Sequence, residues 1–90
     1  MLKNELTKIL NSCLELIDVL SLNKQIKITL LKETDDSSQY NDYYLLFASS
    51  YGGCKAYFAN KYATFELLEQ DIKDKIAHVF KSHMLRLAQH

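Results

Sequence analysis

Residues 43–58 read YYLLFASSYGGCKAYF, and this segment gives the clearest indication of the fold. Two runs rich in apolar and aromatic residues, 43–51 and 54–63, flank the pair Gly52-Gly53. Such runs are typical of β-strands. A glycine pair between them suits a tight turn, because glycine tolerates positive φ at both central positions. The stretch therefore predicts two antiparallel strands joined by a hairpin turn at the glycines.

A further strand is expected just before this hairpin. The segment KQIKITLLKET at 24–34 repeats with a period of two and contains β-branched residues, with Ile26, Ile28 and Leu30 on one side. This period is that of a strand. The segment DDSSQYND at 35–42 is rich in turn-forming residues and predicts a polar loop between the first two strands.

The two ends of the chain carry the spacing of amphipathic helices. Between 2 and 21, apolar residues recur at intervals of three and four, and SLN at 21–23 interrupts the pattern. A second pattern of this kind runs from 68 to 87, and Thr64 is placed to cap its helix. The order α-β-β-β-α predicts an α+β fold in which a three-stranded antiparallel sheet packs against two helices.

Composition restricts the classes of protein to consider. The 90 residues include 48% apolar residues and no proline, and no linker-like segment divides them, so one domain spanning 1–90 is expected. Eleven basic residues balance eleven acidic ones, and no apolar run approaches the roughly 20 residues that cross a bilayer. We expect a cytoplasmic protein with no membrane partner, in which Cys13 and Cys54 are free thiols.

Catalytic and metal-binding patterns are weak. Cys54 follows the glycine pair, but a thiol nucleophile needs a base, and the histidines all come much later in the chain. His78 and His83 lie about 140° apart on a helix and cannot share a metal as an i, i+4 pair would. His83 falls on the apolar stripe, which favours a hydrogen-bonded core or interface histidine. We expect no enzyme activity, no metal and no cofactor.

One candidate binding region is the acidic loop with its flanking tyrosines. No lysine or arginine occurs between 33 and 42, and tyrosine is enriched at the centres of protein interfaces. A basic partner surface, such as the nucleic-acid-binding groove of a nuclease, would suit this loop; a solvated loop without a partner is the alternative. The candidate contact residues are Asp35, Asp36, Tyr40, Asp42, Tyr43 and Tyr44.

A second candidate surface follows from the phase of the strands. The side expected to face the helices carries Ile26, Ile28, Leu30, Leu45, Phe47 and Phe58. The opposite side then carries Thr29, Leu31, Tyr44, Leu46 and Tyr57. Two helices on one side would leave this apolar face open to water. Homodimerisation through Leu31, Leu46 and Tyr57 is the expectation, and a different partner protein is the second choice.

A basic last helix provides the case for nucleic-acid binding. Between 73 and 90 there are three lysines and one arginine but a single acidic residue. The order α-β-β-β-α is also that of double-stranded RNA-binding domains, which use lysines at the start of the last helix. Here that helix begins TFELLEQDI, with three acidic residues that would repel phosphate. We expect direct nucleic-acid binding to be the weaker alternative.

These observations favour a small non-enzymatic protein-binding module. Short chains without a catalytic constellation that carry aromatic and acidic surfaces are typical of inhibitors and immunity proteins, which occlude a partner surface. Examples are toxin-immunity proteins and phage inhibitors of bacterial defence nucleases such as anti-CRISPR proteins. The alternatives are a nucleic-acid-binding regulator that uses the basic C-terminal helix, and a structural or adaptor subunit.

Overall fold

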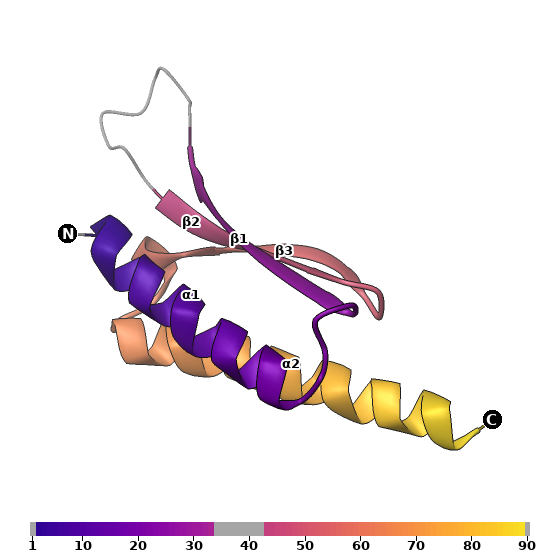
Figure 1. The fold of residues 1–90 in the computed structure, drawn as a ribbon. Coiled ribbons are helices and arrows are strands. Elements are labelled where there is room, and N and C mark those ends of the chain that lie inside the picture. The colour runs from indigo at the N-terminus through magenta and orange to yellow at the C-terminus, as the bar shows by residue number, and fades with distance from the viewer. Residues whose placement is uncertain (1, 34–42, 90) are drawn as a thin grey trace.

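The computed structural model describes residues 2–33 and 43–89, and it confirms the α+β fold in the order α1-β1-β2-β3-α2 (Figure 1). A short 3-10 helix, Ala59–Lys61, connects β3 to α2. The elements are α1 (Leu2–Val19), β1 (Ile26–Lys32), β2 (Tyr43–Ser49), β3 (Gly53–Phe58) and α2 (Phe65–Ala88). The third strand therefore stops at Phe58, well before the expected 63, because the chain turns into the 3-10 helix there.

Both helices have well-defined ends that the local sequence explains. Leu22 donates its backbone N–H to the carbonyl of Ile17 at 2.9 Å, while Ser21 adopts a left-handed φ of 57°. This is the geometry in which the chain closes the end of a helix and buries the next apolar residue, here Leu22. At the start of α2, the Thr64 side chain accepts a hydrogen bond from the N–H of Leu67, as expected for its cap.

The sheet is antiparallel in the order β1-β2-β3, and the predicted hairpin joins β2 to β3. Its turn differs from the expectation. Ser49 pairs with Gly53, so three residues, 50–52, form the connection, and of the two glycines only Gly53 has a positive φ, at 67°. A three-residue connection closed by a left-handed glycine is a common alternative to the two-residue turn.

The longer turn reverses the expected phase of β3. With Ser49 opposite Gly53, Leu45 pairs with Tyr57 and Tyr44 pairs with Phe58. Because successive strand residues point to opposite faces, a shift by one residue exchanges the two sides. Tyr57 lies in the core with 2% of its surface exposed, and Phe58 lies on the opposite face. The assignment of Tyr57 to the open face and of Phe58 to the helix side was therefore wrong.

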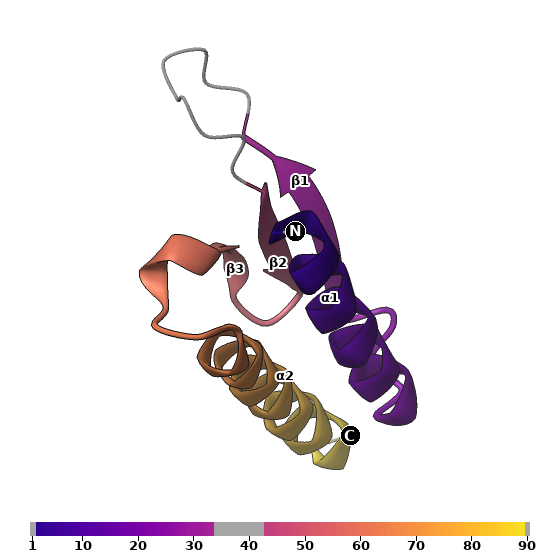
Figure 2. The same ribbon diagram turned by 90° about the vertical axis from the view of Figure 1, so that its left-hand side faces the viewer.

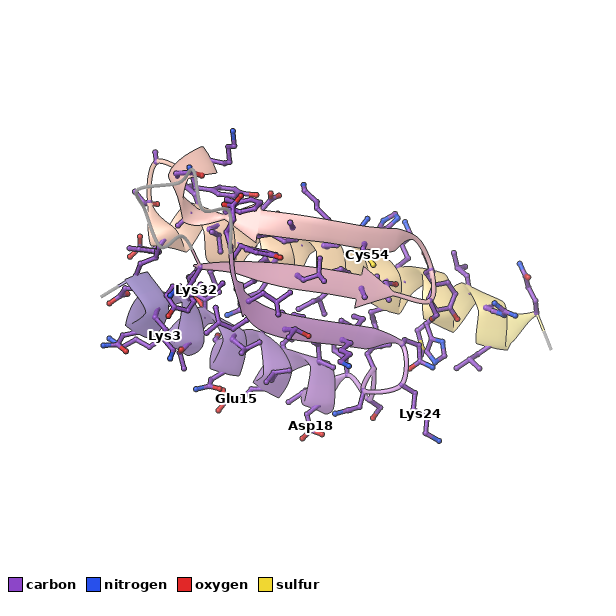
Figure 3. The ribbon with its side chains drawn as sticks, turned by 90° about the horizontal axis from the view of Figure 1, so that it is seen from above. Lys3, Glu15, Asp18, Lys24, Lys32 and Cys54 are labelled. Atoms are coloured by element: carbon purple, nitrogen blue, oxygen red, sulfur yellow. The ribbon has the colours of Figure 1, made fainter. Side chains whose placement is uncertain are left out.

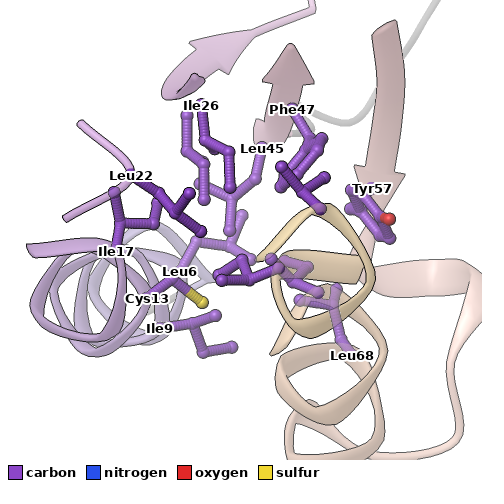
Figure 4. Packing of buried hydrophobic residues seen from close by; sticks show 14 residues of the cluster. Leu6, Ile9, Cys13, Ile17, Leu22, Ile26, Leu45, Phe47, Tyr57 and Leu68 are labelled. Atoms are coloured by element: carbon purple, nitrogen blue, oxygen red, sulfur yellow. The ribbon is translucent and has the colours of Figure 1, made fainter. Parts of the chain in front are cut away.

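Two layers make up the molecule, with α1 and α2 both packed on one face of the sheet (Figures 1 and 2). Side chains from both helices and all three strands meet between the layers (Figure 4). The buried cluster consists of Leu6, Ile9, Cys13, Ile17, Leu22, Ile26, Ile28, Leu45, Phe47, Tyr57, Leu68, Ile72, Ile76 and Val79.

The hairpin turn is tied to the long helix α2. The Tyr51 hydroxyl and Nδ1 of His83 lie 2.8 Å apart in a hydrogen bond, and the two rings meet edge to face at 5.8 Å. The expectation of a hydrogen-bonded histidine at position 83 is confirmed. Beyond this contact α2 continues past the sheet and past α1 (Figure 1). Its last turns expose Met84, Leu85 and Leu87.

Candidate functional site

The face of the sheet that points away from the helices is the candidate site, and we call it the open face. It consists of nine outward positions in three cross-strand rows, set by the strand register. The first row is Leu31, Tyr44 and Phe58, the middle row is Thr29, Leu46 and Ala56, and the last row is Lys27, Ala48 and Cys54. Figure 3 looks down on this face; among the described residues, no helix or strand lies over it.

The apolar side chains of the open face lie outside the core. None of its apolar residues belongs to the buried cluster or to the partly buried residues packed against that cluster. The rings of Tyr44 and Phe58 stack at a centroid distance of 4.8 Å and form an aromatic platform at one end. Stacked rings in fixed positions are good contact points, because little conformational entropy is lost when a partner covers them.

Charge is nearly absent from the open face. Of its nine positions only Lys27 carries a charge, and it lies in the row farthest from the aromatic pair. Large apolar residues are half-buried there, including Leu31, Leu46 and Phe58, while Ala56 and Cys54 are exposed. A contiguous apolar surface of this kind on one side of a sheet is typical of protein-binding sites.

The residues expected to bind a partner do not all lie on one surface. Tyr44 lies on the open face, whereas its neighbour Tyr43 packs against the core on the helix side. Nζ of Lys3 and Nζ of Lys32 lie 5.7 and 6.0 Å from the centre of the Tyr43 ring. The remaining members of that set, Asp35, Asp36, Tyr40 and Asp42, fall outside the residues that the structure describes.

The expected self-association residues divide in a similar way. Leu31 and Leu46 lie on the open face, and Tyr57 lies in the core. Five members of the open face were not named from the sequence: Lys27, Ala48, Cys54, Ala56 and Phe58. Cys54, Ala56 and Phe58 lie on β3, and the expected two-residue turn assigned β3 the opposite phase. A turn of three residues places them correctly. Ala48 could have been found from its alternation with Leu46 in β2.

The two cysteines occupy opposite environments. Cys13 is fully buried between the layers, and this burial raises the pKa of its thiol to about 11. The charge of Lys73 on α2 lowers this pKa by a smaller amount, and the charge of Glu69 raises it. A thiol with a raised pKa is a poor nucleophile at neutral pH. Cys54 is exposed on β3 (Figure 3), at the turn end of the open face.

Two polar contacts involve residues at the start of α2. The Tyr62 hydroxyl donates a hydrogen bond to Asp71 at 2.5 Å, and burial together with this bond raises the Tyr62 pKa above its usual range. Lys73 pairs with Glu69 at 3.5 Å along α2. Within residues 2–33 and 43–89, no group of three or more His, Cys, Asp or Glu residues could hold a metal ion.

One hollow of the described surface lies away from the open face. It is an open groove of about 830 Å³ between the first turns of α1 and the start of α2. Its lining is Leu2, Asn4, Glu5, Thr7, Lys8 and Phe65. The groove is open to solvent and four of its six lining residues are polar or charged, so it lacks the enclosure of a typical small-molecule pocket.

Comparisons with known proteins give no match: neither a family model, nor a curated protein, nor a solved structure is similar to the chain. Among the described residues, no helix is long and apolar enough to span a membrane.

Proposed function

We propose that the chain is a non-enzymatic protein-binding module that covers a surface of its partner and makes this contact through the open face. The observation that carries the proposal is that eight of nine outward positions on three paired strands are uncharged while both helices lie on the other side. Covering apolar surface is favourable by about 25 cal/mol per Å², which supplies the driving force for association.

The rigidity of this surface also supports a binding role. The strands that carry it are held by backbone pairing and by the buried cluster beneath them. The Tyr44–Phe58 stack provides a large aromatic contact near one end. Binding energy in protein interfaces is concentrated in such aromatic residues, and a preformed site loses little free energy to ordering when it binds.

Within this class we favour an inhibitor or immunity-type protein, such as a toxin-immunity protein or a phage inhibitor of a bacterial defence nuclease. Such proteins act by occlusion, which needs shape and apolar area but no reactive group. An adaptor subunit would use the same surface. The two differ in consequence, because an inhibitor abolishes an activity of the protein that it covers and an adaptor preserves it.

The test compares two single lysine substitutions on opposite sides of the molecule. Leu46→Lys places a charge at the centre of the open face, and Leu14→Lys changes a leucine on α1 that is 42% exposed. Each variant and the wild-type protein are used to capture proteins from lysate of cells that express the chain, and a captured protein is then purified and titrated by calorimetry.

We expect Leu46→Lys to weaken binding of the purified partner by about a hundredfold or more, because the charge must be desolvated at the contact. Leu14→Lys should bind like the wild type. Equal binding by all three proteins would contradict the proposal. The activity of the partner, measured with and without the chain, then separates inhibitor from adaptor.

A further inference from the structure

We propose that the open face docks onto the open face of a second copy. The two-fold axis between the copies lies in the plane between the two sheets and runs perpendicular to the strands. This inference rests on the proposed use of the open face for protein contacts and names one occupant for it. Two copies would bury both apolar faces at once and give a four-layer arrangement of helices, sheet, sheet and helices.

A gradient of side-chain size across the open face is the first argument. The row of Leu31, Tyr44 and Phe58 is bulky, whereas the opposite row is low on β2 and β3, at Ala48 and Cys54, and carries the long side chain of Lys27 on β1. A face that is high at one end and low at the other cannot pack tightly against a flat surface. It can pack against a surface with the reverse gradient, since interiors and interfaces reach the same close packing.

A second copy presents the reverse gradient of side-chain size when the two-fold axis runs perpendicular to the strands. An axis perpendicular to the strands inverts the order of the rows but keeps each strand over its counterpart. Phe58 then lies over Cys54 of the second copy, Tyr44 lies over Ala48, and Leu46 meets Leu46 at the axis. An axis parallel to the strands would instead stack bulky row on bulky row and leave a gap between the low ends.

Charge gives a second, independent argument for the same axis. Inverting the rows moves Lys27 over the bulky row of the second copy, beside the ring faces of the Tyr44–Phe58 stack. The chain already makes contacts of this kind: Nζ of Lys55 lies 4.9 Å from the centre of the Tyr57 ring, and two lysines lie over Tyr43. A lysine over an aromatic face is stabilised, and the two copies of Lys27 stay apart.

The size of the face sets the expected strength. Three strands about 4.8 Å apart, with three outward rows along about 17 Å, present on the order of 240 Å² in projection. Two copies therefore bury less than the roughly 1,200 Å² at which interfaces of standard size begin. We expect a dimer with a dissociation constant of about 10 to 100 µM, which dissociates on dilution.

Opposite charges at position 31 test both the dimer and its axis. Leu31 and Lys27 are four residues apart on one strand, about 13 Å, which is too far for an ion pair within one chain. In the proposed dimer, position 31 of each copy lies opposite Lys27 of the other copy, so this pair occurs twice. Leu31→Glu should therefore attract Lys27 of the second copy, and Leu31→Lys should repel it. The edge strand β1 tolerates either charge without loss of the fold.

Sedimentation equilibrium of the full chain from about 5 to 500 µM measures the dissociation constants. We expect Leu31→Lys to dimerise at least about tenfold more weakly than Leu31→Glu at low salt. The double variant Lys27→Glu with Leu31→Lys should recover the affinity of Leu31→Glu. Leu46→Lys should be monomeric throughout, and Leu14→Lys on α1 should dimerise like the wild type, with circular dichroism confirming that each variant is folded.

Three results would overturn the inference. A wild-type monomer at 500 µM, or a dimer that Leu46→Lys leaves intact, would remove the second copy from the open face. Equal loss of the dimer in Leu31→Glu and Leu31→Lys would remove the perpendicular axis. The proposed function fails separately, because it depends on the binding of a different protein and on the effect of Leu46→Lys upon that binding.

Discussion

The two faces of the sheet are built from similar residues and meet different surroundings. The helix side carries Phe47 and Tyr57, whose rings meet edge to face at 6.4 Å, and the open face carries the Tyr44–Phe58 stack at 4.8 Å. Helices bury the first pair, and nothing in the described chain covers the second. A strand such as YYLLFA, apolar on both sides, is typical of a sheet that is covered twice.

This difference separates two uses of apolar residues that have the same composition. On the helix side they stabilise the fold, because their surface is removed from water in the monomer. On the open face they add little to the stability of one copy and are available for association. Each prediction below tests whether the two faces differ in this way.

Two truncations at neighbouring positions of β2 should differ most strongly in stability. Phe47→Ala removes a core ring that is 1% exposed and should lower the free energy of unfolding by about 3–5 kcal/mol. The neighbouring variant Leu46→Ala, on the open face, should cost less than about 1 kcal/mol, since Leu46 leaves no internal cavity. Urea unfolding at low micromolar protein gives both values. Similar losses in the two variants would contradict the assignment of the faces.

The buried thiol of Cys13 provides the second prediction, through pH. Its pKa is about 11 in the folded chain against an ordinary value of 9.0, because burial disfavours the thiolate. The unfolded chain therefore loses this proton first as pH rises. The stability associated with the buried thiol is fully present below pH 9 and is lost between about pH 9 and 11.

A variant without the thiol should show this directly. Cys13→Ala is less stable than the wild type at pH 7, and the difference should narrow by about 2 kcal/mol at pH 10.5, since only the wild type has the thiol to ionise. Leu6→Ala removes another fully buried side chain that does not titrate, and its penalty should stay constant over the same range. A constant penalty for Cys13→Ala would show that the thiol is not buried as described.

Local patterns were enough to predict the elements of this fold and their order. The spacing of three and four residues in 2–21, the alternation from Ile26 to Leu30 and the cap at Thr64 each depend on near neighbours in the sequence. Contacts between distant segments leave no such local signal. The bond between Tyr51 and His83 joins residues 32 positions apart, so the sequence indicated a bonded histidine but not its partner.

The candidate site was harder to predict because it depends on whether the turn between β2 and β3 has an even or an odd number of residues. Leu31, Tyr44 and Leu46 follow from alternation within their own strands. The phase of β3 relative to β2 depends on whether two or three residues turn the chain, and both lengths accept the sequence SSYGGC. A difference of one residue in the length of the turn therefore determines whether Tyr57 or Phe58 lies on the open face.

That turn gives the smallest effect and the most direct test of the two faces. Gly53 has a φ of 67° and Gly52 does not have a positive φ, while a Cβ on either glycine would meet no atom within 4 Å. Gly53→Ala should therefore lower the free energy of unfolding by about 1 kcal/mol through backbone strain. Gly52→Ala should leave it unchanged or raise it by up to about 1 kcal/mol, because alanine restricts the unfolded chain. Thermal unfolding of the two variants at equal concentration measures the difference.

The two-residue turn would place both glycines in the left-handed region, and both substitutions would then be costly. A loss confined to Gly53 supports the three-residue turn, and with it the position of Phe58 on the open face.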